Sequence, residues 1–263
     1  MFRQVKWSRA VRFVPEAAEG RASLCLAVLS LLLLSGWGCT AAPEPAIMDA
    51  KDALAILQAG NARFARGTEL HPHTDAIRRH ELAQHGQHPY AAIVGCSDSR
   101  VPVEIVFDQG LGDLFVIRVA GNVIATDEAG TIEYAVEHMQ IPLVIVLGHS
   151  NCGAVTAVVN GSHEHGSILR LVEHIRPAVE QVRSRHPGLS DEALVPLAVE
   201  QNVLHSMEDL IVHSEVVREA LNAGRMQLVG AVYDIDTALV RWLGPHPEQA
   251  RLIDSPITPS REP

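Results

Sequence analysis

Two cysteines, one histidine and one aspartate in this chain could together bind a metal ion. Cys96 and Asp98 stand close together in one segment, and His149 and Cys152 stand close together in another. Thiolate, imidazole and carboxylate groups are the ligands that hold zinc in tetrahedral sites. With Asp98 as a ligand the zinc site is closed, and without it a fourth position stays open. The four residues therefore predict a Zn²⁺ site and leave its resting state undecided.

A disulfide bond between Cys96 and Cys152 is the alternative to a metal site. Two cysteines in an oxidising compartment often pair in this way. A disulfide, however, requires neither Asp98 nor His149. The metal site accounts for all four residues and is therefore our preferred interpretation.

Each cluster directly follows a short apolar run. Residues 91–94 precede Cys96, and residues 143–147 precede His149. Such runs are typical of buried strands in a parallel sheet. Ligands bind beyond the carboxyl ends of the strands in open sheets of this kind. We therefore expect the four side chains to meet at one edge of the sheet.

The order of strands and helices predicts an α/β fold. A central, mostly parallel sheet of four to five strands is expected, flanked by helices, because strands and helices alternate. The proline-rich stretch after Gly244 predicts an irregular tail. The expected strands are 90–95, 113–119, 143–147 and 226–233, and the expected helices are 50–65, 126–140, 153–159, 167–183 and 196–212, with a loop and a short helix over 71–88.

Residues 1–38 predict a secretory signal peptide. Basic residues precede an apolar run from Ala22 to Leu34, and small residues follow it. The run is shorter than the roughly 20 residues that span a bilayer. Cys39 directly follows Gly38 and resembles the lipidated first residue of a bacterial lipoprotein. We therefore expect a periplasmic protein, with Cys39 as a candidate membrane tether.

The rest of the chain divides into a short linker, a main domain and a tail. Their expected bounds are 39–47, 48–244 and 245–263. The formal net charge of the full chain is −10 at pH 7. A negative balance of this size argues against binding nucleic acid or an anionic lipid surface through charge.

These residues resemble the β-class carbonic anhydrases. The resemblance extends from about residue 48 to about residue 244. The pairing of two separate metal-ligand motifs with a matching segment between them makes it specific. The matching pieces are G-N-A-R-F at 60–64, C-S-D-S-R at 96–100, F-D-Q-G-L-G-D-L-F-V-I-R-V-A-G-N at 107–122 and G-H-S-N-C-G-A-V at 148–155.

The resemblance implies reversible hydration of carbon dioxide to bicarbonate and a proton. Zinc lowers the pKa of bound water from 15.7 toward about 7, which supplies hydroxide at neutral pH. Two thiolates oppose this effect by donating charge, and Arg100 is the residue placed to compensate. Asp98 and Arg100 are the expected catalytic pair: Asp98 either pairs with Arg100 and orients the attacking oxygen, or ligates zinc and closes the site. An ion pair that only braces a turn is the alternative.

Two further positions match substrate-binding residues of the family. Gln109 is expected to hydrogen-bond substrate or bicarbonate, and Gly153 to offer its backbone N–H nearby. Both could instead serve only as turn residues. Family members with an inhibitory bicarbonate pocket carry tryptophan where this chain has Ile93, whereas Arg118 and Tyr233 match the other two pocket positions.

Alternative functions on the same scaffold remain open at this point. One is a carbon disulfide or carbonyl sulfide hydrolase, because fold does not fix substrate. Another is a periplasmic zinc- or bicarbonate-binding protein whose site Asp98 keeps closed. The resemblance also implies a homodimer or homotetramer, with the helix over 50–65 wrapped over a partner subunit. That helix has an apolar face and, from sequence, no strand of its own to cover.

Overall fold

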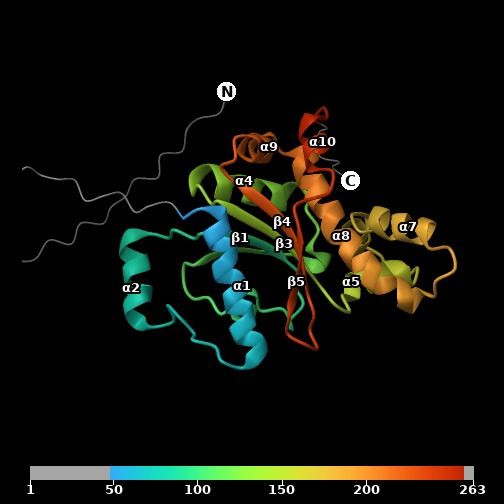
Figure 1. The fold of residues 1–263 in the computed structure, drawn as a ribbon. Coiled ribbons are helices and arrows are strands. Elements are labelled where there is room, and N and C mark those ends of the chain that lie inside the picture. Colours follow the sequence, from blue (N-terminus) through green and yellow to red (C-terminus); the bar gives the residue numbers. More distant parts are fainter. Residues whose placement is uncertain (1–47, 258–263) are drawn as a thin grey trace, which may run out of the picture. The chain divides into compact units, whose positions relative to one another are not determined.

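The structure is a computed structural model that describes residues 48–257, within which five strands form one sheet in the order β2-β1-β3-β4-β5 (Figure 1). The first four strands are parallel, and β5 runs antiparallel to β4. The predicted α/β fold with a mostly parallel sheet is confirmed, and the fifth strand is β5. The strands are β1 (Ala91–Gly95), β2 (Leu114–Arg118), β3 (Leu143–His149), β4 (Gln227–Tyr233) and β5 (Val240–Gly244).

The central strands are buried on both faces, which explains their unbroken apolar sequence. In β1, Ala91 and Ile93 belong to the core on one side of the sheet, and Ala92 and Val94 to the core on the other. Helices α1 (Ala50–Arg66) and α3 (Val103–Val106) contribute to the first core. The second core is built with α4 (Thr126–His138), α8 (Asp191–His213), α9 (Glu215–Asn222) and α10 (Gln249–Asp254).

The first helix packs on its own sheet. Asp49 caps its start by accepting a hydrogen bond from the Asp52 N–H at 2.7 Å, and Gly67 ends it at φ 65°. Ala53 and Leu57 are fully buried in the same core as β1. The expectation that the apolar face of α1 has no strand of its own to cover is therefore wrong. This face packs against the sheet of the same chain. Contact between α1 and a partner subunit stays a prediction.

A loop and a short helix, α2 (Ala76–His85), follow α1 as predicted, and no residue of α2 is buried. The loop is tied to the body by Asp108, which accepts hydrogen bonds from the Arg63 Nε at 2.6 Å, the Leu70 N–H and the His71 N–H. The α2 segment therefore stands on the surface and carries exposed apolar side chains.

Two predicted helices differ from the structure by more than a residue or two at their ends. The single helix expected over 167–183 is divided into α6 (Ser167–Glu173) and α7 (Arg176–Arg185), because Pro177 at the start of α7 cannot donate the hydrogen bond that would continue α6. Helix α8 starts at Asp191 rather than at Pro196. Ser190 caps it, and Pro196 lies within it.

The stretch after Gly244 is not wholly irregular, because it contains α10. Its prolines flank the helix instead of interrupting it, and Leu252 packs into the core. The buried guanidinium of Arg218 binds this end of the chain to α8. It donates to the backbone carbonyls of Ile211, Val212, Ile253, Ser255 and Pro256.

None of the helices within residues 48–257 combines the length and the apolar character that a bilayer crossing needs. The predicted signal peptide, Cys39 and the linker 39–47 lie outside the described residues.

Candidate metal centre

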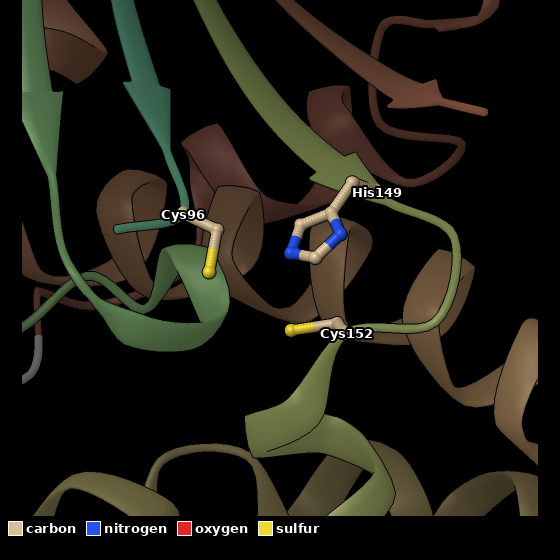
Figure 2. A group of neighbouring side chains, drawn as sticks. All are labelled: Cys96, His149 and Cys152. Atoms are coloured by element: carbon tan, nitrogen blue, oxygen red, sulfur yellow. The ribbon is translucent and has the colours of Figure 1, made fainter. Parts of the chain in front are cut away.

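The parallel pairing of β1 with β3 brings the predicted ligands together. Gly95, the last residue of β1, pairs with Leu147 of β3. Cys96 directly follows β1, His149 ends β3, and Cys152 directly precedes α5 (Gly153–Val159). Their side chains converge on one space (Figure 2). The two sulfur atoms and one ring nitrogen lie within 4.8 Å of one another.

The imidazole of His149 is oriented for a metal. Its ring is fully buried, and Nδ1 lies 2.9 Å from the Ser150 carbonyl oxygen, which fixes Nδ1 as the donor. Within the described residues Nε2 has no hydrogen-bond partner. A buried ring nitrogen is costly without a partner. A cation between Nε2 and the two sulfur atoms satisfies it, and two thiolates with one imidazole are a donor set that zinc prefers.

The two cysteines are free thiols in the part of the chain that the structure describes. The disulfide alternative is therefore not supported. The hydrogen bond with Cys152 lowers the pKa of Cys96, whereas the same bond and burial raise the pKa of Cys152. Of the two thiols, Cys96 therefore loses its proton more readily.

Backbone contacts fix the turn that carries His149 and Cys152. The Ser150 N–H donates to the Tyr233 carbonyl at 2.8 Å, and the Ile235 N–H donates to the Ser150 Oγ at 2.9 Å. Asn151 adopts a left-handed conformation with φ 53°. The end of β4 therefore sets the position of both ligands.

Asp98 pairs with Arg100 rather than with the metal cluster. The Arg100 Nε and Nη2 donate to the two carboxylate oxygens at 2.9 Å and 2.7 Å, and the Arg100 N–H adds a third bond at 2.9 Å. These bonds hold the pKa of Asp98 well below its usual range. Asp98 Oδ2 lies 3.9 Å from His149 Nε2. The carboxylate is therefore beside the cluster, and its ligation of zinc stays a prediction.

Arg118 supports the turn that carries Cys96 and Asp98. Its Nε donates to the Cys96 carbonyl at 3.0 Å and its Nη2 to the Asp98 carbonyl at 2.6 Å. Ile93 and Tyr233, the other two positions compared with the bicarbonate pocket, are buried in the core on the α1 side of the sheet. Arg118 thus has a role in positioning that its match to the pocket did not indicate.

The two predicted substrate residues lie in different settings. Both ends of the Gln109 amide are occupied, since the Tyr90 hydroxyl donates to its oxygen and its nitrogen donates to the Phe107 carbonyl at 2.8 Å. Gly153 begins α5 next to Cys152, and a Cβ there would meet nothing within 4 Å. The roles of Gln109 and Gly153 toward substrate stay predictions.

Two contributors to the site were missed in the sequence. The Gly121 N–H donates to the Cys96 Sγ at 3.3 Å, and the Asn202 amide donates to the Gly121 carbonyl at 2.7 Å. Asn202 could have been noticed because it is a polar amide among apolar residues in the helix predicted over 196–212.

Comparison with known proteins agrees with this geometry. A protein-family model described as carbonic anhydrase matches residues 91–240. A carbonic anhydrase of Mycolicibacterium smegmatis is 42% identical over 183 residues, which cover 68% of this chain and 86% of the relative. Carbonic anhydrase 2 of Mycobacterium tuberculosis is 41% identical over 184 residues, with the same coverage.

Solved structures show the same relationship. The β-carbonic anhydrase CafA of Aspergillus fumigatus is 30% identical with a TM-score of 0.62, over 79% of this chain and 98% of that one. The β-carbonic anhydrase CcaA is 29% identical with a TM-score of 0.59, over 65% of this chain and 90% of that one. Together with the Cys96–His149–Cys152 cluster, these matches show that the chain belongs to the β-class carbonic anhydrases, which are zinc enzymes.

Proposed function

We propose that this carbonic anhydrase hydrates carbon dioxide reversibly and that the Asp98–Arg100 pair controls access to the fourth zinc position. The observation that carries the proposal is the placement of Asp98, doubly bonded to Arg100 with Oδ2 3.9 Å from His149 Nε2. Bound zinc supplies a Lewis acid that makes water acidic enough to attack carbon dioxide near neutral pH.

The residues around the cluster divide the remaining work. Cys96, His149 and Cys152 would hold the metal, and the two cysteines are packed among buried apolar side chains. Asp98 is placed to accept a hydrogen bond from the attacking oxygen and so to orient it. Arg100 keeps the carboxylate ionised and turned away from the metal. Its Nη2 also donates to the Asn151 carbonyl at 3.3 Å, which ties the pair to the turn between His149 and Cys152.

The placement of Asp98 supports two alternative roles for its carboxylate. Both carboxylate oxygens accept hydrogen bonds from Arg100, and turning one of them to zinc would move it away from the guanidinium. The pair therefore acts as a gate: the site is open while Asp98 is held by Arg100 and closed when Asp98 turns to the metal.

The test of the function is stopped-flow carbon dioxide hydration by the zinc-loaded protein, with His149→Ala as the metal-site control. We expect wild type to accelerate hydration and the variant to lose both zinc and activity. Wild-type protein that holds one zinc per chain and does not accelerate hydration would refute the proposal and favour the closed, non-catalytic alternative.

We also propose that the enzyme is exported to the periplasm and that Cys39 tethers it to a membrane. The support is the basic, apolar and small-residue order of residues 1–39. Cell fractionation with mass spectrometry of the mature N-terminus tests this. An intact Met1 in the cytoplasm would refute export, and a mature Cys39 without an acyl group would refute the tether alone.

The enzyme is further proposed to form a homodimer or homotetramer. Exposed apolar side chains on and beside α2 support an interface there: Leu70 is 70% exposed, Ile77 72% and Leu111 42%. The α2 segment is held next to Leu111, because the Arg78 Nε donates to the Leu111 carbonyl at 3.0 Å. Burying such a surface against a second copy is favourable.

A further inference from the structure

We propose that Asn202 of α8 is a positioning residue for the Cys96 thiolate and that it acts through the backbone of Gly121. The inference rests on zinc being held by Cys96, His149 and Cys152. It adds to the proposed function a chain of contacts that starts in a helix far along the sequence and ends on a sulfur ligand.

The chain of contacts has two hydrogen bonds. The Asn202 Nδ2 donates to the Gly121 carbonyl at 2.7 Å, and the Gly121 N–H donates to the Cys96 Sγ at 3.3 Å. Both bonds are buried, and Asn202 is 1% exposed. Both bonds are therefore shielded from bulk water in the folded protein.

The backbone of Gly121 is fixed between these two bonds. Its φ of 73° is left-handed, a conformation that favours glycine. A Cβ at this position would lie 2.6 Å from Ile175 Cδ1 and 3.3 Å from Ala154 Cβ, so apolar side chains pack closely against the Cα of Gly121. The amide of Asn202 and this packing together hold the turn so that its N–H faces the sulfur.

The hydrogen bond to Gly121 explains better than packing why an asparagine occupies position 202. Its Oδ1 has no hydrogen-bond partner within the described residues. The neighbouring α8 residues Val199 and Val203 are apolar and face Gly148 of β3. An unpartnered buried oxygen destabilises the fold, and an apolar side chain of similar size would avoid this cost.

A hydrogen bond to a zinc thiolate has two effects. It orients the sulfur, and it draws charge away from it, so that the sulfur donates less charge to the metal. The second effect matters here because two thiolates would otherwise weaken zinc as a Lewis acid. Asn202 thus contributes to the electronic state of the site without touching the metal.

The first test is made on the wild-type holoenzyme. In ¹⁵N-labelled protein with ¹¹³Cd in place of zinc, we expect a scalar coupling between the Gly121 amide proton and the metal through Cys96 Sγ. A cadmium-loaded wild type without this coupling would overturn the inference. Zinc analysis of the same preparation shows separately whether the metal-site assignment stands.

The second test compares Asn202→Leu with Asn61→Leu. Asn61 is a matched control because it is also a buried asparagine, and it bonds to the Val106 and Ala238 carbonyls and the Val240 N–H, away from the thiolates. Asn202→Leu should weaken zinc binding about 10- to 100-fold in competition with a chromophoric chelator. It should also abolish the cadmium coupling and move the sulfur-to-cobalt charge-transfer band of the Co²⁺ form to longer wavelength.

Asn61→Leu should change stability and leave these three metal readouts as in wild type. Wild-type affinity and an unmoved cobalt band in Asn202→Leu would contradict the inference, as would equal metal effects in both variants. If Asn202→Leu does not fold, Asn202→Ser replaces it, since a serine side chain is too short to reach the Gly121 carbonyl.

Discussion

The carboxylate of Asp98 is turned toward Arg100, with Oδ2 2.7 Å from the Arg100 Nη2 and 3.9 Å from His149 Nε2. One short movement therefore separates an arginine-bound carboxylate from a metal-bound one.

Replacing Arg100 with alanine should leave zinc bound and reduce hydration activity. Without the guanidinium, Asp98 is free to ligate the metal and close the site. Groups that act by electrostatics or by proton transfer typically contribute about 10²- to 10³-fold. Stopped-flow hydration at equal zinc content measures the effect. Arg241→Ala is the control, because Arg241 pairs with Glu200 at 2.7 Å on the surface. Near-wild-type turnover of Arg100→Ala would show that the pair only braces a turn.

Replacing Cys152 with serine should remove most of the zinc. Serine keeps the size of the side chain but offers a hydroxyl in place of a thiolate. Elemental analysis of dialysed protein gives the zinc content per chain, with one zinc expected in wild type. Wild type should also melt at a higher temperature with zinc than after chelation, because a ligand that binds only the folded state stabilises it. Full zinc occupancy in Cys152→Ser would remove this residue from the ligand set.

Asp108→Asn should destabilise the protein by about 2 kcal/mol near neutral pH, since charged hydrogen bonds each contribute about 1.5 to 3 kcal/mol. Burial alone would raise the pKa of Asp108, but the Leu70 N–H, the Arg63 guanidinium and the His71 N–H together lower it. A lowered folded-state pKa gives stability that is present above the unfolded value, near 3.9. That stability is lost as the pH falls through the folded-state pKa.

Urea unfolding at a series of pH values checks this sign. The difference between wild type and Asp108→Asn should be largest near neutral pH and should shrink below about pH 4. The exposed residue Asp236 provides the control variant Asp236→Asn. A difference that stays constant down to the lowest pH at which both proteins fold would show that the charge of Asp108 is not responsible.

Arg218→Met should loosen the C-terminal end of the chain. The substitution removes the donor from the buried carbonyl of Ile211 and from four partly buried carbonyls, and a buried group left unsatisfied costs about 1 to 3 kcal/mol. We expect amide hydrogen exchange in α10 to accelerate more than exchange in the central strands. Arg251→Ala provides a comparison within α10, because its pair with Glu248 is exposed. Unchanged protection of α10 in Arg218→Met would show that packing of Leu252 alone holds the helix.

Ile77→Asp should shift the protein toward a smaller assembly. A charge in a buried apolar interface is strongly unfavourable, whereas Ile77 is 72% exposed in the single chain. Light scattering after size-exclusion chromatography measures the mass. Leu189→Asp is the control, since Leu189 is an exposed leucine outside the α2 segment. Wild type that is already monomeric and active at low concentration would refute the interface.

Local patterns were sufficient to predict four of the five strands and the Cys96, His149 and Cys152 cluster. Residues 91–94 and 143–147 read as buried strands, and the parallel pairing of these strands places Cys96 beside His149 as expected. The Asp98–Arg100 pair was predictable for the same reason, because both partners lie in one turn.

Contacts between distant segments were not predictable in this way. Asn202 and Gly121 are 81 residues apart, and their bond depends on how α8 packs on the sheet. The apolar face of α1 packs against the sheet of its own chain. The helical periodicity of α1 shows that such a face exists but not which surface it contacts. Pro196 suggested a helix start, although the Ser190 cap begins α8 one turn earlier and tolerates the proline within it.

The adjacency of β1 and β3 also determines when metal can be captured during folding. Cys96 and His149 meet only after the chain between them has crossed over and β3 has taken its place beside β1. Closing such a long loop costs conformational entropy before the contacts between the two strands can stabilise it. The complete ligand set therefore exists only in a chain in which β1 and β3 are paired. Zinc that binds this set stabilises the folded sheet relative to the unfolded chain.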